Sequence, residues 1–138
     1  MGFTLIEILI ILLIFFILTA YLILGFSFLA PKTLEKEVEK LGGDLLWIRE
    51  LANCNLSSYI ITFDTINNRY ALYRNSVSVN NLIAPPYSLK VNLASAPPQI
   101  AFTSYGKPST SFIQSIQLNK ANRTKTIIIY PNSGAIKW

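Results

Sequence analysis

The sequence predicts an α+β fold in which a long N-terminal helix packs on a small antiparallel β-sheet domain. Three observations support this prediction. Residues 3–30 form one apolar run, residues 31–53 carry apolar side chains at helical spacing, and residues 54–138 are divided by turn residues into short β-type segments. A helix followed only by strands favours one helix layer on one sheet layer.

The apolar run of residues 3–30 is typical of a membrane-spanning helix. It contains 28 residues and a single charged side chain, that of Glu7. At about 1.5 Å per residue it would be ~42 Å long, which exceeds the ~30 Å hydrocarbon core of a bilayer. The surplus requires either tilt or burial in something other than lipid.

Glu7, the one charged residue in this run, is a candidate functional residue. A carboxylate within an apolar helix is costly and needs a partner. No Lys or Arg precedes Lys32, so no nearby basic side chain can neutralise it. Cleavage after Gly2 would create a free amine at Phe3, one helical turn from Glu7. The amine of a neighbouring copy, shifted along the helix axis, would fit better.

Residues 2–7 read Gly-Phe-Thr-Leu-Ile-Glu and head the apolar helix. This stretch resembles the class III signal of type IV pilins and type II secretion pseudopilins. The resemblance implies cleavage between Gly2 and Phe3 by a prepilin peptidase, N-methylation of Phe3, and pairing of Glu7 with the N-terminus of an adjacent subunit. It also implies two further partners, namely other pilin subunits and an inner-membrane assembly platform. The alternative is an ordinary signal anchor with one tolerated acid.

The leader of this family is basic, whereas only Met1 precedes Gly2 here. Either the leader is unusually small or the chain begins upstream of Met1. Because the positive-inside rule has no N-terminal Lys or Arg to act on, a cytoplasmic N-terminus follows from the resemblance alone. We expect the protein in the inner membrane first and in an extracytoplasmic filament afterwards.

The expected organisation has four parts: a residual leader (1–2), a membrane and filament-core helix (3–30), an amphipathic helix half (31–53) and a globular β-rich domain (54–138). The amphipathic half is predicted from one apolar stripe, which consists of Leu34, Val38, Leu41, Leu45, Ile48 and Ala52.

Two places in the helix predict irregularity. Gly25 and Pro31 predict a bend, because proline removes a backbone donor. Gly42 and Gly43 each weaken a helix by about 1 kcal/mol relative to alanine, which predicts a kink or a close approach of another part of the chain.

From Ser57 onward the hydrophobic period changes to that of strands. A hairpin loop is expected at residues 64–68 and a longer loop at 119–124. Four later stretches are residues 100–102 with Gly106, residues 113–118, residues 127–129 and residues 133–136. Together they resemble the C-terminal pattern of the GspH/FimT subgroup of minor pseudopilins and minor pilins. The expected strands are 59–63, 69–73, 87–93 (an edge strand), 100–103, 111–118, 125–130 and 135–137.

Composition argues against an enzyme. The chain has no histidine, which removes the commonest general base and the usual metal ligand. Its single cysteine, Cys54, excludes an intramolecular disulfide and is predicted to be a packed small residue rather than a reactive thiol. No spacing marks an activated nucleophile, and no Gly-rich loop connects a strand to a helix. We therefore expect no catalytic residues, no metal and no cofactor.

The charges are unevenly distributed. All seven acidic residues lie at or before Asp64, and the eight charged residues after it are all basic. The positive electrostatic potential of the second half of the chain favours anionic partners: nucleic acid, phospholipid headgroups or surface polysaccharide.

DNA is one such partner that the resemblance suggests. Some FimT-like minor pilins bind DNA through two arginines near the last strand, where this chain has only Lys137. Lys120, Arg123 and Lys125 would add phosphate contacts, and Trp138 would stack on bases. The alternative is a solvated basic loop with a terminal tryptophan that covers the sheet edge.

The leading hypothesis from the sequence is a structural subunit, a minor one, of a type IV pilus-like or type II secretion pseudopilus filament. A DNA-binding minor pilin for DNA uptake and a major pilin subunit are the alternatives. The sequence leaves open whether the filament would serve adhesion, secretion or competence.

Overall fold

The structure, a computed structural model, describes residues 4–138, together with their side chains outside residues 23–31. It has one long helix, a short 3-10 helix and two four-stranded antiparallel sheets. This is the α+β architecture predicted from the sequence, except that the strands form two sheets instead of one. Gly2 and Phe3 lie outside the described residues.

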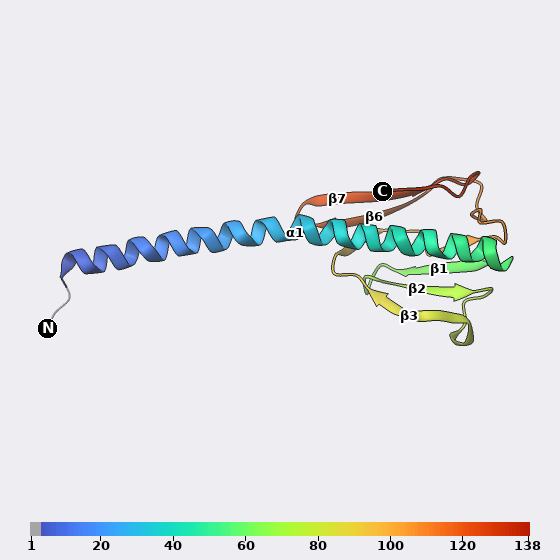
Figure 1. Cartoon of the computed structure of the whole chain (residues 1–138), viewed down its shortest axis with the longest axis horizontal. Helices are drawn as coiled ribbons and strands as arrows, with labels where there is room; N and C mark the ends of the chain where they lie inside the picture. The colour runs from blue at the N-terminus through green and yellow to red at the C-terminus, as the bar shows by residue number, and fades with distance from the viewer. Residues whose placement is uncertain (1–3) are drawn as a thin grey trace.

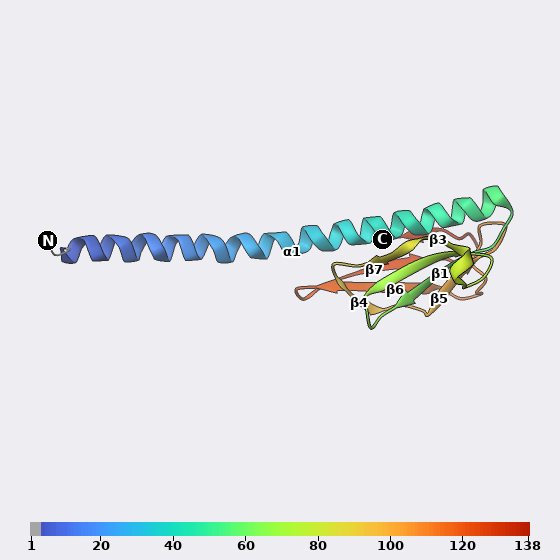
Figure 2. The same cartoon turned by 90° about the horizontal axis from the view of Figure 1, so that it is seen from below.

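The long helix α1 (Leu5–Asn55) contains 51 residues. Its N-terminal half projects from the rest of the molecule, and its C-terminal half lies along the sheets (Figure 1). The helix continues through Gly25 and Pro31, with a gentle change of direction about midway in both views (Figures 1 and 2). It ends at Asn55, and the C-cap residue Leu56 that follows has a left-handed backbone at φ 49°.

The C-terminal half of α1 buries the stripe that the sequence predicted. All six stripe residues are at most 3% exposed, which confirms the amphipathic pattern. Cys54, by contrast, is exposed, so the prediction of a packed cysteine was wrong. It lies two residues after buried Ala52, which at 100° per residue turns its side chain away from the sheets.

The first sheet has the strand order β3-β2-β1-β5. Its strands are β1 (Tyr59–Asp64), β2 (Arg69–Arg74), β3 (Leu82–Ser88) and β5 (Gln99–Phe102). The 3-10 helix η1 (Val79–Asn81) precedes β3. The second sheet has the order β4-β6-β7-β8 and consists of β4 (Asn92–Ser95), β6 (Gln114–Lys120), β7 (Arg123–Ile129) and β8 (Ile136–Lys137).

The single edge strand expected at 87–93 was wrong. The chain leaves the first sheet after β3 and enters the second at β4. Asn68 fixes the segment that connects the two sheets. Its backbone carbonyl oxygen accepts a hydrogen bond from the backbone N–H of Leu89, and its side-chain oxygen accepts one from the backbone N–H of Leu93, each at 2.8 Å. Pro85 and Pro86 lie within β3, which tolerates them because it is an edge strand.

The long loop expected at 119–124 was also wrong. Lys120 pairs with Arg123 at the end of a regular β6–β7 hairpin. The two residues between them, Ala121 and Asn122, have φ values of 50° and 62°. Positive φ at both central residues is the geometry of a two-residue type I′ turn, whose twist matches that of the strands.

One hydrophobic core joins the helix to both sheets. α1 contacts β1 and β5 of the first sheet and β6, β7 and β8 of the second. Figure 2 shows the sheets gathered along one side of the C-terminal half of α1. The strands contribute Tyr59, Ile61, Tyr70, Leu72, Ile100, Phe102, Ile116, Leu118, Ile127 and Ile129. Each fully buried Leu, Ile or Phe side chain stabilises the fold by about 1.5–3 kcal/mol.

Two close approaches fix the C-terminal segment on α1. A Cβ added at Gly42 would lie 2.7 Å from Cε3 of Trp138, so the indole ring packs directly on this glycine. Gly134, at φ +63°, leaves no room for a side chain beside the carbonyl oxygen of Gly106, and both glycines approach Arg49 of α1. The Gly-Gly pair in the helix therefore marks a close approach, by a side chain, at its first member.

The two adjacent glycines make a matched pair of variants. Gly43→Ala enters open space and should stabilise the chain by about 0.5–1 kcal/mol, the usual gain in a helix. Gly42→Ala must displace Trp138 and should leave the chain about 1–3 kcal/mol less stable than Gly43→Ala. Urea unfolding of the full chain in detergent, followed by tryptophan fluorescence, measures both. Equal midpoints for the two variants would contradict the packing of Trp138 on Gly42.

The β1–β2 turn should respond to acid. Asn67, followed by Arg69, lowers the pKa of Asp64 to about 2 from its ordinary 3.8. The turn is therefore stabilised above about pH 4, and this stabilisation is lost as the pH falls through about 2. We expect the melting temperature of Asp64→Asn to change less between about pH 5 and pH 2 than that of the wild type. Glu50→Gln, which removes a carboxylate outside the turn, is the control, and an equally reduced change in this variant would contradict a specific role for Asp64.

Candidate assembly site and basic surface

The first turn of α1 contains Glu7 and its N-cap residue Thr4. Oε2 of Glu7 accepts hydrogen bonds from the backbone N–H and the hydroxyl of Thr4, both at 2.8 Å. The backbone N–H of Glu7 donates to Oγ1 of Thr4 at 3.4 Å, which completes a capping box. Oε1 accepts no hydrogen bond from residues 4–138. One carboxylate oxygen is thus held within the turn, and the other is open to an additional donor.

The surface that follows Glu7 is apolar on all sides. The span Leu5–Leu22 has a mean hydropathy of 2.9, and none of it is buried within the chain. By length and composition it is a helix that can cross a membrane. Glu7 lies in the first turn, so a single helix in a bilayer could keep this carboxylate near the headgroups.

Five polar side chains connect the first sheet to α1, and we call them the docking cluster: Glu37, Lys40, Asp44, Tyr70 and Tyr87. On the helix, Nζ of Lys40 lies 3.2 Å from Oδ2 of Asp44, which also accepts a hydrogen bond from the hydroxyl of Tyr70. The hydroxyl of Tyr87 donates to Oε1 of Glu37 at 3.3 Å, and Nζ of Lys40 lies 4.5 Å above the Tyr87 ring. These contacts connect β2 and β3 to successive turns of the helix.

Both tyrosines in this cluster act as hydrogen-bond donors. Burial raises the pKa of Tyr70, and its hydrogen bond to the Asp44 carboxylate raises it further. Burial also raises the pKa of Tyr87, followed by the charge of Glu37. Because both hydroxyls stay protonated, the cluster positions the sheet instead of carrying out proton transfer.

Glu37 was missed by the sequence analysis. It is only 5% exposed, and its Oε2 has no hydrogen-bond partner among the described residues. The signal was present in the spacing, because Glu37 lies three residues after Leu34 and four before Leu41, on the buried face.

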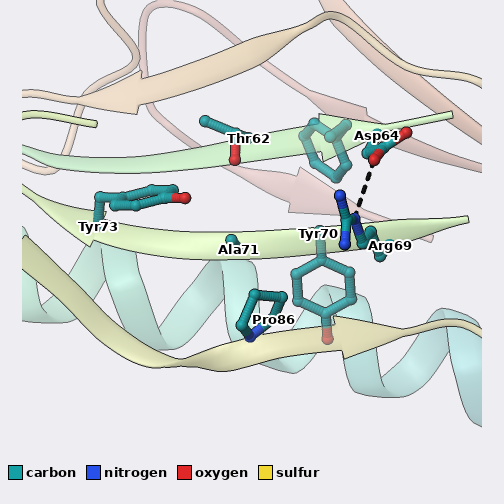
Figure 3. A pocket seen from close by; sticks show the side chains of 8 residues that line it. Thr62, Asp64, Arg69, Tyr70, Ala71, Tyr73 and Pro86 are labelled. Atoms are coloured by element: carbon teal, nitrogen blue, oxygen red, sulfur yellow. Dashed lines mark hydrogen bonds and ion pairs between the residues drawn. The ribbon is translucent and has the colours of Figure 1, made fainter. Parts of the chain in front are cut away.

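A hollow of 220 Å³ lies over β1 and β2 and is shown in Figure 3. Asp64 and Arg69, joined at 2.9 Å, lie at one end of it, and Thr62, Tyr73 and Pro86 line other parts. The charges of Asp64 and Arg69 compensate each other at the turn. The rest of the lining consists of three aromatic side chains, those of Phe63, Tyr70 and Tyr73, and of the smaller Thr62, Ala71 and Pro86.

Metal binding also finds no support in the described part of the chain. Within it, no three His, Cys, Asp or Glu side chains gather into a group that could hold a metal ion. The acidic side chains of α1 either face solvent or belong to the docking cluster.

The basic residues singled out from the sequence fall into two places. Lys120 and Arg123 flank the β6–β7 turn, and Lys125 follows on β7. Nζ of Lys120 donates to the carbonyl oxygen of Lys90 at 3.3 Å, which brings a fourth basic residue to this turn. Lys137 lies on β8 and pairs with Ile128, away from the turn.

Trp138 is more constrained than the sequence suggested. Its ring packs on Gly42 of α1, and 45% of the residue remains exposed. With Glu35, Val38, Glu39 and Lys125 it lines a hollow beside the helix. The ring therefore covers α1, and two carboxylates lie near it, which disfavours the approach of a nucleic acid.

Comparison with known proteins gives a match at the level of structure. No family model and no curated protein matches the chain. Two crystal structures of the type IV minor pilin FimU from Pseudomonas aeruginosa do. The first, in space group P21, has a TM-score of 0.60 and 16% identity and covers 78% of this chain and 88% of that one. The second, in space group P65, has a TM-score of 0.58 and 16% identity and covers 75% and 90%.

At this level of identity the likeness concerns the fold. The chain has a type IV pilin-like α+β fold, in which a long N-terminal helix docks on antiparallel strands. The fold predicted from the sequence is thereby confirmed.

The docking cluster can be tested through Tyr87. Tyr87→Phe leaves both oxygens of the buried Glu37 carboxylate without a hydrogen-bond partner among the described residues, which should destabilise the chain by about 1–3 kcal/mol. Adding Glu37→Leu should recover most of this loss, because the unpaired charge is then removed. Urea unfolding of the full chain in detergent measures both changes. Tyr73→Phe, on neighbouring β2, is the control, and a loss as large as that of Tyr87→Phe would argue against a specific role for the Glu37 contact.

Proposed function

We propose that this chain is a subunit, a minor one, of a type IV pilus-like or type II secretion pseudopilus filament. The observation that carries the proposal is the free half of α1, an unburied apolar rod with a single carboxylate in its first turn, attached to a domain with a pilin-like fold. Such a rod requires a covering, first by lipid and then by the helices of other subunits.

Glu7 would control the step between these two environments. In a bilayer it lies near the headgroups, whereas in a bundle of staggered helices it faces apolar neighbours. An unpaired charge buried there costs several kcal/mol, so subunits out of register are disfavoured. The open Oε1 is available to the amine of an adjacent subunit, while Thr4 holds Oε2.

The N-terminal residues would be processed to provide that amine. Cleavage between Gly2 and Phe3 by a prepilin peptidase leaves a free amino group at Phe3, which the family methylates. The first described residue, Thr4, then lies next to the mature terminus and orients the carboxylate toward the helix start. The partners of the chain would be other pilin or pseudopilin subunits, the peptidase and the inner-membrane assembly platform.

The role is structural and not enzymatic. The absence of histidine from the sequence and of a metal-binding group from the described residues supports this assignment. DNA binding is a second candidate, because Arg123 and Lys125 are exposed and form no ion pair with the described part of the chain.

Glu7→Ala tests the proposed assembly role. We expect the variant to insert into membranes as the wild type does, because the apolar span is intact, but to enter filaments at least about tenfold less. Alkaline extraction of membranes measures insertion, and immunoblotting of sheared filaments measures incorporation.

The matched control is Glu50→Ala, which removes an exposed carboxylate from the docked half of the same helix. Normal incorporation of Glu7→Ala would contradict the role of Glu7. Mass spectrometry of the mature chain supplies an independent check, and an N-terminus that retains Met1 with an unmodified Phe3 would argue against the filament subunit itself.

A further inference from the structure

The β6–β7 turn reaches toward the anchor half of α1. In both Figure 1 and Figure 2 it is the part of the sheets that extends farthest in that direction. Arg123, Thr124 and Lys125 line a hollow of 230 Å³ together with Leu34 and Glu35 of the helix. The turn therefore lies alongside the beginning of the amphipathic half, close to where the apolar run ends.

This end of the domain is basic. We use the term basic end for Lys32, Lys36, Lys90, Lys120, Arg123 and Lys125, all of which lie at the start of the amphipathic half or at the β6–β7 turn. Glu35 and Glu39 are the exposed acids nearby, and neither forms an ion pair with a basic residue among residues 32–138. Six basic and two exposed acidic side chains thus lie at this end of the domain.

With Ala30 at the edge of the hydrocarbon core, the basic end would lie at the level of the lipid headgroups. The apolar run ends at Ala30, and Leu34 follows four residues later, or about 6 Å along the helix axis. The headgroup layer of one leaflet is about 5–7 Å thick. Because lysine and arginine side chains extend from their backbone toward polar surroundings, the turn can reach phosphate groups at this level.

We propose that the basic end binds the anionic headgroups of the leaflet from which α1 emerges, and so holds the globular domain on the membrane before assembly. The inference rests on the proposed anchoring of α1. Near an anionic surface each basic side chain strengthens attraction about fivefold in the binding constant. Entry into a filament would then require these contacts to be released.

Lipid fits this surface better than DNA. The basic end faces the membrane beside the anchor, where a duplex would have to enter the gap between domain and bilayer. The turn residues Ala121 and Asn122 offer no ring for base stacking. Trp138 lies with its ring on Gly42. Phosphate contact without stacking is what a headgroup layer needs.

The test uses the full chain in lipid nanodiscs. A fluorophore on Asn122→Cys, in a Cys54→Ser background, reports contact through quenching by a headgroup-labelled lipid. We expect strong quenching in discs that contain phosphatidylglycerol and weak quenching in discs of phosphatidylcholine alone. Lys120→Gln with Arg123→Gln should lower the equilibrium constant for contact by about 25-fold in the anionic discs.

Arg74→Gln with Lys107→Gln is the matched control. It removes the same charge from the opposite end of the domain, near the C-terminal end of α1, and should leave quenching unchanged. Equal quenching in the two kinds of disc, or an equal loss in the control pair, would overturn the proposal.

Two further arms identify the source of the phosphate. Free glycerol phosphate at the concentration of the lipid headgroups should not release the turn, and release by it would show binding of a soluble phosphate instead. The second arm adds a short DNA duplex to phosphatidylcholine discs. If the duplex binds the wild type but not Lys120→Gln with Arg123→Gln, and anionic lipid causes no quenching, the surface would be assigned to nucleic acid.

A separate readout distinguishes failure of this inference from failure of the filament role. Incorporation of Lys120→Gln with Arg123→Gln into sheared filaments should remain at least at the wild-type level, because assembly releases the membrane contact. Loss of incorporation in this variant with normal headgroup quenching would overturn the proposal, since the charges would then serve contacts between subunits.

Discussion

The structure depends on the packing of one apolar stripe of α1 against two sheets at once. Within residues 4–138 no backbone ladder joins the β3-β2-β1-β5 sheet to the β4-β6-β7-β8 sheet, and both contact the same half of the helix. The docking cluster of Glu37, Lys40, Asp44, Tyr70 and Tyr87 adds specific polar contacts between the helix and the first sheet. The span Leu5–Leu22 at the other end of α1 is apolar, and none of it is buried by the described part of the chain. One continuous helix therefore serves two environments, a protein core and a second one outside the domain.

The sequence predicted the helix and its buried face because helical periodicity is a local signal that the docked face obeys at every stripe position. The strand boundaries failed where tertiary contacts decide. Asn68 redirects the chain between sheets through hydrogen bonds to residues more than twenty positions away, which no local pattern announces. The β6–β7 turn uses Ala121 and Asn122 at positive φ, where glycine would have been the recognisable residue.

The candidate sites divide in the same way. Glu7 could be found from sequence, because a lone acid in a long apolar run is visible without a structure. Its two hydrogen bonds with Thr4 could not be assumed, since they depend on where the helix begins. The excess of basic residues was evident, but its concentration beside the anchor follows from the hairpin's direction. Glu37 lies on the buried face by its spacing, but its hydrogen-bond donor Tyr87 is 50 residues away, so no local pattern announces this contact.

The alignment of strands and helix has a mechanical consequence. In both views the strands lie roughly along the axis of α1, so a pull on the projecting rod would load the interface in shear (Figures 1 and 2). The stripe from Leu34 to Ala52 extends over about 27 Å of helix, and its side chains would have to slip together. Tension would therefore be shared by five turns of packing and by both sheets in parallel, an arrangement that resists force better than strands peeled apart one bond at a time.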